Sequence, residues 1–327
     1  MSLREVRRLS FCTNEEVMNI ASLLKIEHPI IQGAMAEIAL PQLVAAVSNA
    51  GALGVLASGG WSSKKLRENI RICRSMTDKP FAVNLMLMMT NIHELVEVVI
   101  EEKVAVVTTG AGTPKNYMPR LKEAGVIVIP VVPSARLAKK MEDIGADAVV
   151  AEGMESGGHV GEITTMALIP QTVDAVSIPV IAAGGVADAR GVVAAFALGA
   201  KGVQMGTRFV TTVESPVHPN FKQAIIAAGD SDTVVTGRGK GVPVRCLRND
   251  MTAQYVRMEA DPNVTLDELE HLTLGSLRRA ATEGDVQSGS VMAGQISGLI
   301  DELVTCRELV SSIMADARKL AGGLSID

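Results

Sequence analysis

Eight short runs of aliphatic residues recur between about residues 29 and 209, with segments of helical periodicity between them. The runs are continuously apolar rather than alternating, as is typical of strands in a parallel sheet that is buried on both faces. They begin at Pro29, Leu53, Pro80, Val104, Val126, Ala146, Pro179 and Gly202. The intervening helices that the periodicity predicts include Leu40–Asn49, Lys64–Met76, Ile92–Glu102, Ala135–Ile144 and Ala187–Leu198. Eight successive strand–helix units predict an α/β protein, a closed (β/α)8 TIM barrel.

Glycines support these helix boundaries. Gly51, Gly125, Gly145 and Gly199 directly follow predicted helical segments, where C-terminal caps are expected. The competing architecture, a doubly wound sheet, requires G-x-G-x-x-G directly after its first strand. The turn after the first strand here begins Gly33-Ala-Met-Ala, which does not match. The sequence therefore favours the barrel.

The repeating pattern ends near Val210. Residues 1–209 are expected to form the barrel together with an N-terminal extension. Residues 210–290 lack the strand–helix repeat and are expected to form a small helical lid subdomain after the eighth strand. Residues 291–327 are expected to hold C-terminal helices that pack back on the barrel.

Composition narrows the classes of function. Aromatic residues make up only 2% of the chain, so the core is aliphatic, and the net charge of −5 argues against a general nucleic-acid surface. No apolar run reaches the roughly 18 residues that suggest a membrane span, and no apolar segment follows the basic N-terminus as in a secretory signal. The scattered cysteines are Cys12, Cys73, Cys246 and Cys306. We expect reduced thiols, no metal site and a cytoplasmic protein.

In a barrel of this kind, function is built at the carboxyl ends of the strands. Gly184-Gly185 follows the seventh strand and Gly206-Thr207 follows the eighth. Barrels commonly hold a phosphate at these two ends, where backbone N–H groups and a helix N-terminus favour an anion. Taken alone, Gly184-Gly185 is equally well explained as a tight turn. The two pairs together predict a phosphate site.

Three polar residues at other strand ends are candidates for the chemistry. Asn84 ends the third strand, and its carboxamide offers both a donor and an acceptor to a flat heterocycle, although it also suits a strand-end turn. Glu152 ends the sixth strand. Two roles are open for it: to accept a hydrogen bond from a hydroxyl group of a ligand, or to serve as a structural residue. His159 lies in a glycine-rich loop after the sixth strand, where we expect a flexible loop and an imidazole that titrates near neutrality. The alternative for His159 is a solvated surface histidine.

Longer strings resemble a known family. Gln32–Ala36, Ala151–Gly161, Ile181–Gly185 and Gln204–Phe209 are similar to motifs of the FMN-dependent nitronate monooxygenase superfamily. Within it, the chain most resembles the bacterial enoyl-acyl-carrier-protein reductases of the second type. That closer resemblance rests on Thr77–Leu87, Val107–Gly112, Ile129–Ser134, His218–Lys222 and Gly289–Gln295. One departure is Ala34, where the family pattern has glycine.

The resemblance implies a set of residue roles. His159 would be the catalytic histidine. The residues that would contact FMN are Gly33, Ala34, Met35, Asn84, Glu152, Gly157, Gly184, Gly185, Gly206 and Thr207. NADH or NADPH would be the co-substrate, and a monovalent cation would be required at a site that the sequence does not place. Nitronate monooxygenase and NAD(P)H:quinone reductase activities remain alternatives on the same scaffold, as does a non-catalytic FMN or acyl-carrier binding module.

The partner that the resemblance implies is an acyl carrier protein bearing an enoyl group, and we also expect a homodimer. Acyl carrier proteins are acidic, so a local basic patch is required on this acidic chain. Arg238, Lys240, Arg245 and Arg248 form such a cluster in the sequence of the lid. A solvated face is the alternative explanation for the cluster.

Overall fold

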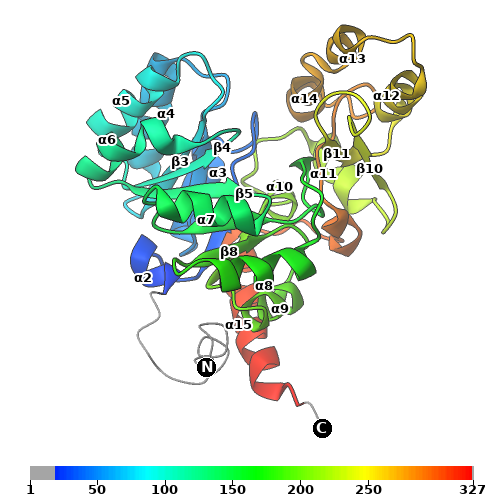
Figure 1. Ribbon diagram of the computed structural model, residues 1–327. Coiled ribbons are helices and arrows are strands. Elements are labelled where there is room, and N and C mark those ends of the chain that lie inside the picture. The colour runs from blue at the N-terminus through cyan, green and yellow to red at the C-terminus, as the bar shows by residue number, and fades with distance from the viewer. Residues whose placement is uncertain (1–18, 326–327) are drawn as a thin grey trace.

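Eight parallel strands form a nearly closed barrel at the centre of the computed structural model, which describes residues 19–325 (Figure 1). Cys12 and the rest of the N-terminal extension up to residue 18 lie outside the described residues. The barrel strands are β1 (Ile30–Gln32), β2 (Gly54–Ala57), β3 (Phe81–Met86), β4 (Val106–Gly110), β5 (Ile127–Val132), β6 (Val149–Glu152), β8 (Val180–Ala183) and β9 (Gly202–Met205). Their order in the sheet is β1-β9-β8-β6-β5-β4-β3-β2. The predicted TIM barrel is confirmed, with each aliphatic run as one strand.

The barrel closes between β1 and β2 through a short contact. Ile31 and Leu53 form a single parallel bridge, and Leu53 exchanges backbone hydrogen bonds with Ile30 and Gln32. The buried Gln32 side chain extends this seam: its Oε1 accepts a hydrogen bond from Val55 N at 3.2 Å. The Gln32 carboxamide therefore adds a hydrogen bond between β1 and β2, where the backbone forms only one bridge.

Helices cover the outside of the barrel. They are α3 (Pro41–Asn49), α4 (Ser63–Met76), α5 (Ile92–Glu101), η2 (Pro114–Asn116), α6 (Met118–Glu123), α7 (Ala135–Asp143), α8 (Thr165–Ala175) and α9 (Ala189–Ala197). The predicted capping glycines, Gly51, Gly125, Gly145 and Gly199, all have positive φ, as helix C-caps do. A long final helix, α15 (Cys306–Gly323), extends to the bottom of Figure 1 and packs against α9 and α3.

Inward-facing residues of the strands fill the barrel with a second, smaller apolar core. Ile31, Val55 and Val106 belong to it, together with Ile20 and Leu24 from the short helix α2 (Ile20–Leu24). Because α2 packs into the same interior cluster, its apolar side chains close one end of the barrel. The other end, where the strands finish, stays open.

The lid differs from the helical subdomain that the sequence predicts, because it contains a three-stranded sheet. Strand β10 (Thr233–Thr236) pairs with β11 (Val244–Leu247), and β11 pairs with β7 (Gly158–His159), which belongs to the loop after β6. Its helices are α12 (Asp250–Ala260), α13 (Leu266–Thr273), α14 (Ser276–Arg278) and η3 (Arg279–Glu283), at the upper right of Figure 1. Linking elements are α10 (Thr207–Val210), α11 (Pro219–Ile226) and η4 (Gln295–Leu299). The domain boundaries stay a prediction.

Two further features concern the described residues alone. Between residues 19 and 325, no helix is both long and apolar enough to cross a membrane. Cys73, Cys246 and Cys306 are free and buried, and burial raises the pKa of each thiol to about 12. These three thiols therefore stay protonated and unreactive near neutral pH.

The packing of β2 on α3 leads to a stability prediction. A Cβ atom at Gly54 would lie 2.2 Å from the backbone oxygen of Val44, so the strand and helix would have to move apart. We expect Gly54→Ala to lower the free energy of unfolding by about 1–3 kcal/mol, the usual cost of overpacking. Urea unfolding measures it. Gly322→Ala is the matched control, because Gly322 is exposed in α15 and a Cβ there meets nothing within 4 Å. Equal stability of the two variants would contradict the prediction.

Candidate active site

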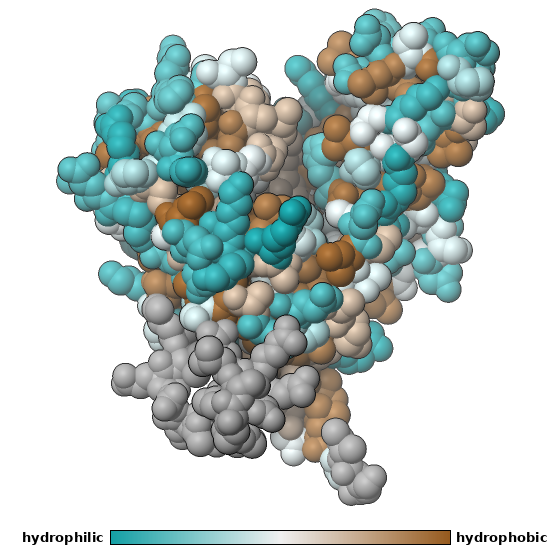
Figure 2. Space-filling model, viewed as in Figure 1, coloured by the Kyte–Doolittle hydropathy of each residue, from teal (hydrophilic) through white to brown (hydrophobic). Residues whose placement is uncertain are grey.

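A cavity of about 690 Å³ lies at the carboxyl ends of the barrel strands, between the barrel and the lid. The hollow between these two parts is visible in Figure 2. The cavity is lined by every residue that the sequence singled out for the site: Gly33, Ala34, Met35, Asn84, Glu152, Gly157, His159, Gly184, Gly185, Gly206 and Thr207. The structure thus brings together side chains and backbone from the ends of five barrel strands, β1, β3, β6, β8 and β9. Their individual roles stay predictions.

The two glycines after β8 have a backbone that favours glycine. Gly184 and Gly185 have φ values of +84° and +73°, a region that other residues rarely adopt. A Cβ at Gly184 would also lie 2.7 Å from the carbonyl oxygen of Gly153. Both explanations of this pair therefore apply: the chain turns tightly here, and the turn lines the cavity. Successive backbone N–H groups in such turns form concave sites for anions.

Thr207 joins the barrel to the segment that returns from the lid. Its Oγ1 accepts a hydrogen bond from Gly294 N at 2.9 Å. A hydroxyl group that accepts one bond still has its hydrogen to donate. Gly206 is the N-cap of α10, and Thr207 is the first residue of that helix. Both line the cavity wall together with Gly184 and Gly185. These four residues form the part of the wall best suited to a phosphate.

Asn84 is held in place on β3. Its Nδ2 donates to Thr108 Oγ1 at 2.9 Å, and its backbone oxygen accepts from Ser58 Oγ at 2.6 Å. The first bond fixes the plane of the carboxamide and uses one of its two N–H hydrogens. The other N–H and the carbonyl oxygen are therefore available to a ring edge with alternating donors and acceptors.

Glu152 ends β6 in the floor of the cavity. Burial raises the pKa of this carboxyl group from its usual 4.5 to about 7. The nearby Ser156 hydroxyl offsets little of this effect, because its buried oxygen makes no well-formed hydrogen bond. Glu152 is consequently protonated in a large fraction of molecules at neutral pH, and can donate as well as accept a hydrogen bond.

His159 lies on β7 rather than in the flexible loop that the sequence predicts. It pairs with Val244 of β11, so the sheet of the lid fixes its backbone. The side chain is exposed at the cavity, and the surrounding walls displace enough water to lower the pKa of the imidazole below its usual value. A neutral imidazole, with one N–H and one basic nitrogen, is therefore its main form at neutral pH.

Several lining residues were not singled out in the sequence. Met86, the last residue of β3, and Met88, two residues later, line the cavity. Val242, Leu277 and Met292 complete this apolar wall from the lid and the returning segment. They carry no local pattern that distinguishes them from core residues, because the lid brings them over the barrel only in three dimensions.

The basic cluster predicted on the lid is not a single exposed patch, and that prediction was wrong for Arg245. Arg245 is buried, with 4% of its surface exposed. The Lys240 amino group donates to the backbone oxygens of Asp261 and Val264. Of the four residues in the predicted cluster, only Arg238 and Arg248 present exposed guanidinium groups.

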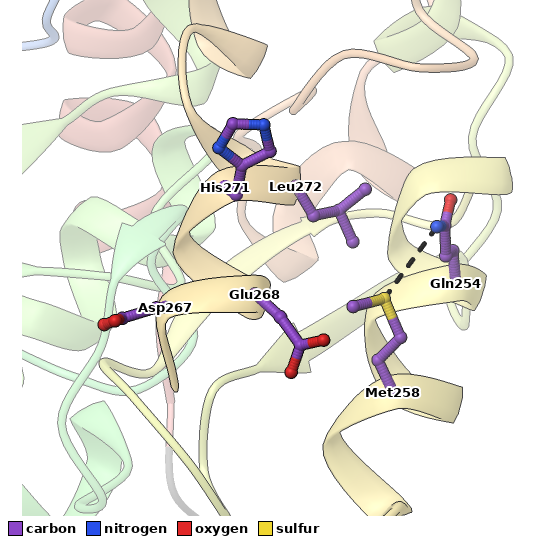
Figure 3. A pocket seen from close by; sticks show the side chains of 6 residues that line it. All are labelled: Gln254, Met258, Asp267, Glu268, His271 and Leu272. Carbon is purple, nitrogen blue, oxygen red and sulfur yellow. Dashed lines mark hydrogen bonds between the residues drawn. The ribbon is translucent and has the colours of Figure 1, made fainter. Parts of the chain in front are cut away.

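A second depression, of about 500 Å³, lies between α12 and α13 on the lid. Its six lining side chains come from these two helices alone (Figure 3). None of the residues predicted for the site contributes to it. Within residues 19–325 there is also no group of three or more His, Cys, Asp or Glu side chains placed to hold a metal ion. The barrel mouth is therefore the candidate active site.

The raised pKa of Glu152 leads to a prediction about pH. Because the folded protein holds this proton more tightly than the unfolded chain does, the free energy of unfolding falls as pH rises from about 4.5 to above about 7. In the flavin-free wild type we expect this fall to be about 2 kcal/mol between roughly pH 4 and pH 9, after allowance for solvent in the cavity. Glu152→Gln, which has no proton to lose, should abolish it. Urea unfolding at both pH values tests this, with the exposed Glu123→Gln as control. Parallel pH dependence in the wild type and Glu152→Gln would refute it.

Comparison with known proteins places this site in a family. The profile of the nitronate monooxygenase family matches residues 18–95 and 88–316. The structure of FabK from Thermotoga maritima is 50% identical, with a TM-score of 0.89 over 93% of this chain and 96% of that chain. A (3aS,4S,5R,7aS)-5-hydroxy-7a-methyl-1-oxo-octahydro-1H-indene-4-carboxyl-CoA dehydrogenase of Rhodococcus jostii is 35% identical over 92% of this chain and 95% of its own. A probable nitronate monooxygenase of Staphylococcus saprophyticus is 32% identical over 92% of this chain and 98% of its own. The resemblance seen in the sequence is confirmed: the chain belongs to the nitronate monooxygenase family of oxidoreductases, with FabK as a close structural match.

Proposed function

We propose that this chain reduces the double bond of trans-2-enoyl thioesters carried by an acyl carrier protein, with FMN as cofactor and NADH or NADPH as reductant. The observation that carries the proposal is that ten predicted FMN contacts and His159 line one cavity. The 50% identity to FabK over nearly the whole length favours this reaction over others in the family.

The residues present fit FMN. The turn at Gly184 and Gly185, with Gly206 and Thr207 beside it, would bind the phosphate through backbone N–H groups and the Thr207 hydroxyl. Asn84 would meet the edge of the ring system, and Glu152 would bind a hydroxyl group of the connecting chain. Bound FMN would supply a carrier that takes a hydride from NAD(P)H and gives it to the β-carbon of the enoyl group.

His159 would act at the other end of the substrate. As hydride reaches the β-carbon, negative charge develops on the thioester oxygen, and the α-carbon then takes up a proton. A neutral imidazole can stabilise that oxygen with its N–H, and this role agrees with the lowered pKa of His159. Delivery of the α-proton requires the protonated ring, which is less populated near neutral pH. The apolar wall of Met86, Met88 and Met292 would exclude water from the reacting carbons.

Nitronate monooxygenase activity is the second candidate. The same lowered pKa keeps the His159 ring in the basic form that removes a proton next to a nitro group. The relative from Staphylococcus saprophyticus also bears that name. In that reaction O2 would be the oxidant.

Half-reactions with the purified flavoprotein separate these candidates. Under anaerobic conditions NADH or NADPH should bleach the visible flavin absorbance. Crotonyl-CoA, a nitronate and a quinone are then added in separate experiments. We expect crotonyl-CoA to restore the absorbance fastest. Faster recovery with the nitronate or the quinone would assign that activity instead, and a colourless protein that does not take up FMN would refute the proposal.

The same assay tests the histidine. We expect His159→Ala to slow reoxidation by crotonyl-CoA by about 10²–10⁴-fold, the usual range for loss of an acid–base group. Flavin content should not change, because the phosphate and ring contacts lie on other residues. His93→Ala is the control, since His93 is exposed on α5 outside the cavity. Wild-type turnover in His159→Ala would remove this residue from the reaction.

The proposed carrier partner has a smaller basic surface than expected. Arg238 is exposed in the turn between β10 and β11, which also holds the cavity-lining Val242, and Arg248 is exposed at the other end of β11. We expect Arg238→Glu with Arg248→Glu to slow reduction of a carrier-bound enoyl group and to flatten its salt dependence, because rim charges act mainly on association. The rate with crotonyl-CoA serves as the internal control. An unchanged rate with the carrier-bound substrate would mean that these residues are a solvated face. The homodimer, the nicotinamide preference and the monovalent cation stay predictions.

A further inference from the structure

Arg245 is a buried cation of the lid that the proposed reaction does not use. It lies on β11, the central strand of the three-stranded sheet. Its Nη2 and Nε donate to the backbone oxygen of Met154 at 3.0 and 3.3 Å, and its Nη1 donates to Thr233 Oγ1 at 2.8 Å. All of these acceptors are uncharged. The Glu155 carboxylate lies close enough to attract Arg245 but makes no ion pair with it among the described residues. Burying a guanidinium group without such a pair is unfavourable, so stability alone does not explain an arginine here.

The oxygen of Met154 marks the base of the loop that carries His159. Met154 N donates to the oxygen of Ile163 at 2.9 Å, which closes residues 154–163 into a loop. Arg245 contacts this loop at two points. Its backbone pairs with Gly158, the residue before His159, and its side chain reaches back to Met154. One residue of the lid therefore fixes both the base of the loop and its tip.

Other contacts of the loop hold different parts of it. The Glu155 carboxylate accepts from Thr165 N and Oγ1, which anchors the loop to the start of α8. The oxygen of Glu155 accepts from Gln295 N at 2.9 Å. Val160 N donates to the oxygen of Pro243, next to β11. Within the part of the chain that the structure describes, Arg245 is the residue whose side chain connects the lid sheet to the loop base.

We propose that Arg245 is a positioning residue for His159. The two hydrogen bonds from its guanidinium group to the Met154 carbonyl oxygen hold the loop in the position in which β7 presents the imidazole to the cavity. This inference rests on the proposed role of His159. It explains why a charged side chain occupies the centre of a small sheet. It also makes the lid part of the reaction without direct contact between Arg245 and the substrate.

The test uses the flavin-loaded enzyme and the crotonyl-CoA reaction. We expect Arg245→Gln to lower kcat by about 10- to 100-fold, because a displacement of about 1 Å at the reacting group has an effect of this order. The KM for crotonyl-CoA and the flavin content should change little. Arg245→Lys, which keeps one charged donor for the Met154 oxygen, should recover part of the rate. Arg257→Gln, on the exposed face of α12, is the matched control and should equal the wild type.

A double variant separates this inference from the proposed function. If Arg245 acts through His159, Arg245→Gln should slow the His159→Ala enzyme no further. If the fold-losses in kcat of the two single variants multiply in the double variant, the positioning role is overturned. It is also overturned if Arg245→Gln has wild-type kcat while His159→Ala is slow. Wild-type turnover in His159→Ala would instead refute the proposed function of the histidine. If Arg245→Gln does not fold, the kcat of Arg245→Lys decides, and an unchanged value overturns the inference.

Discussion

The close approach of two backbone segments holds the candidate site together. The loop after β6 meets the segment returning from the lid at Gly157 and Gly294. A Cβ at Gly157 would lie 2.7 Å from the carbonyl carbon of Ala293, and one at Gly294 would lie 2.7 Å from the oxygen of Glu155. At this distance Gly294 N also reaches Thr207 Oγ1. Three parts of the chain far apart in sequence are thereby joined at one point, beside the proposed phosphate site.

The sequence was sufficient to predict the barrel because its pattern is local. A parallel strand buried on both faces appears as a short aliphatic run, and a helix cap appears as a glycine at the right place. Strand ends then gather at one mouth by topology alone, so Asn84, Glu152 and Gly184 were expected to meet before any geometry was known.

The lid could not be predicted in this way. Strand β7 has two residues, which is too short to leave an alternating pattern, and its partner β11 comes much later in the chain. Arg245 looked like a surface charge, because arginine is rarely buried. Its burial depends on the Met154 carbonyl, a backbone group that has no signature in the sequence. The position of the Glu155 side chain could not be predicted either, because it depends on hydrogen bonds from Thr165, at the start of the next helix.

The two-residue length of β7 limits how such an enzyme can diversify. Neighbouring residues of a strand face opposite sides, so one residue inserted between Met154 and Gly158 would turn the imidazole away from the mouth or unpair the strand. An insertion in this loop is therefore incompatible with the proposed role of His159. The side chains of Val242, Leu277 and Met292 carry no such restriction, since they line the cavity from the lid and the returning segment and do not belong to the histidine loop. New substrates on this scaffold should accordingly arise by exchange of those three side chains, with the length of the histidine loop kept constant.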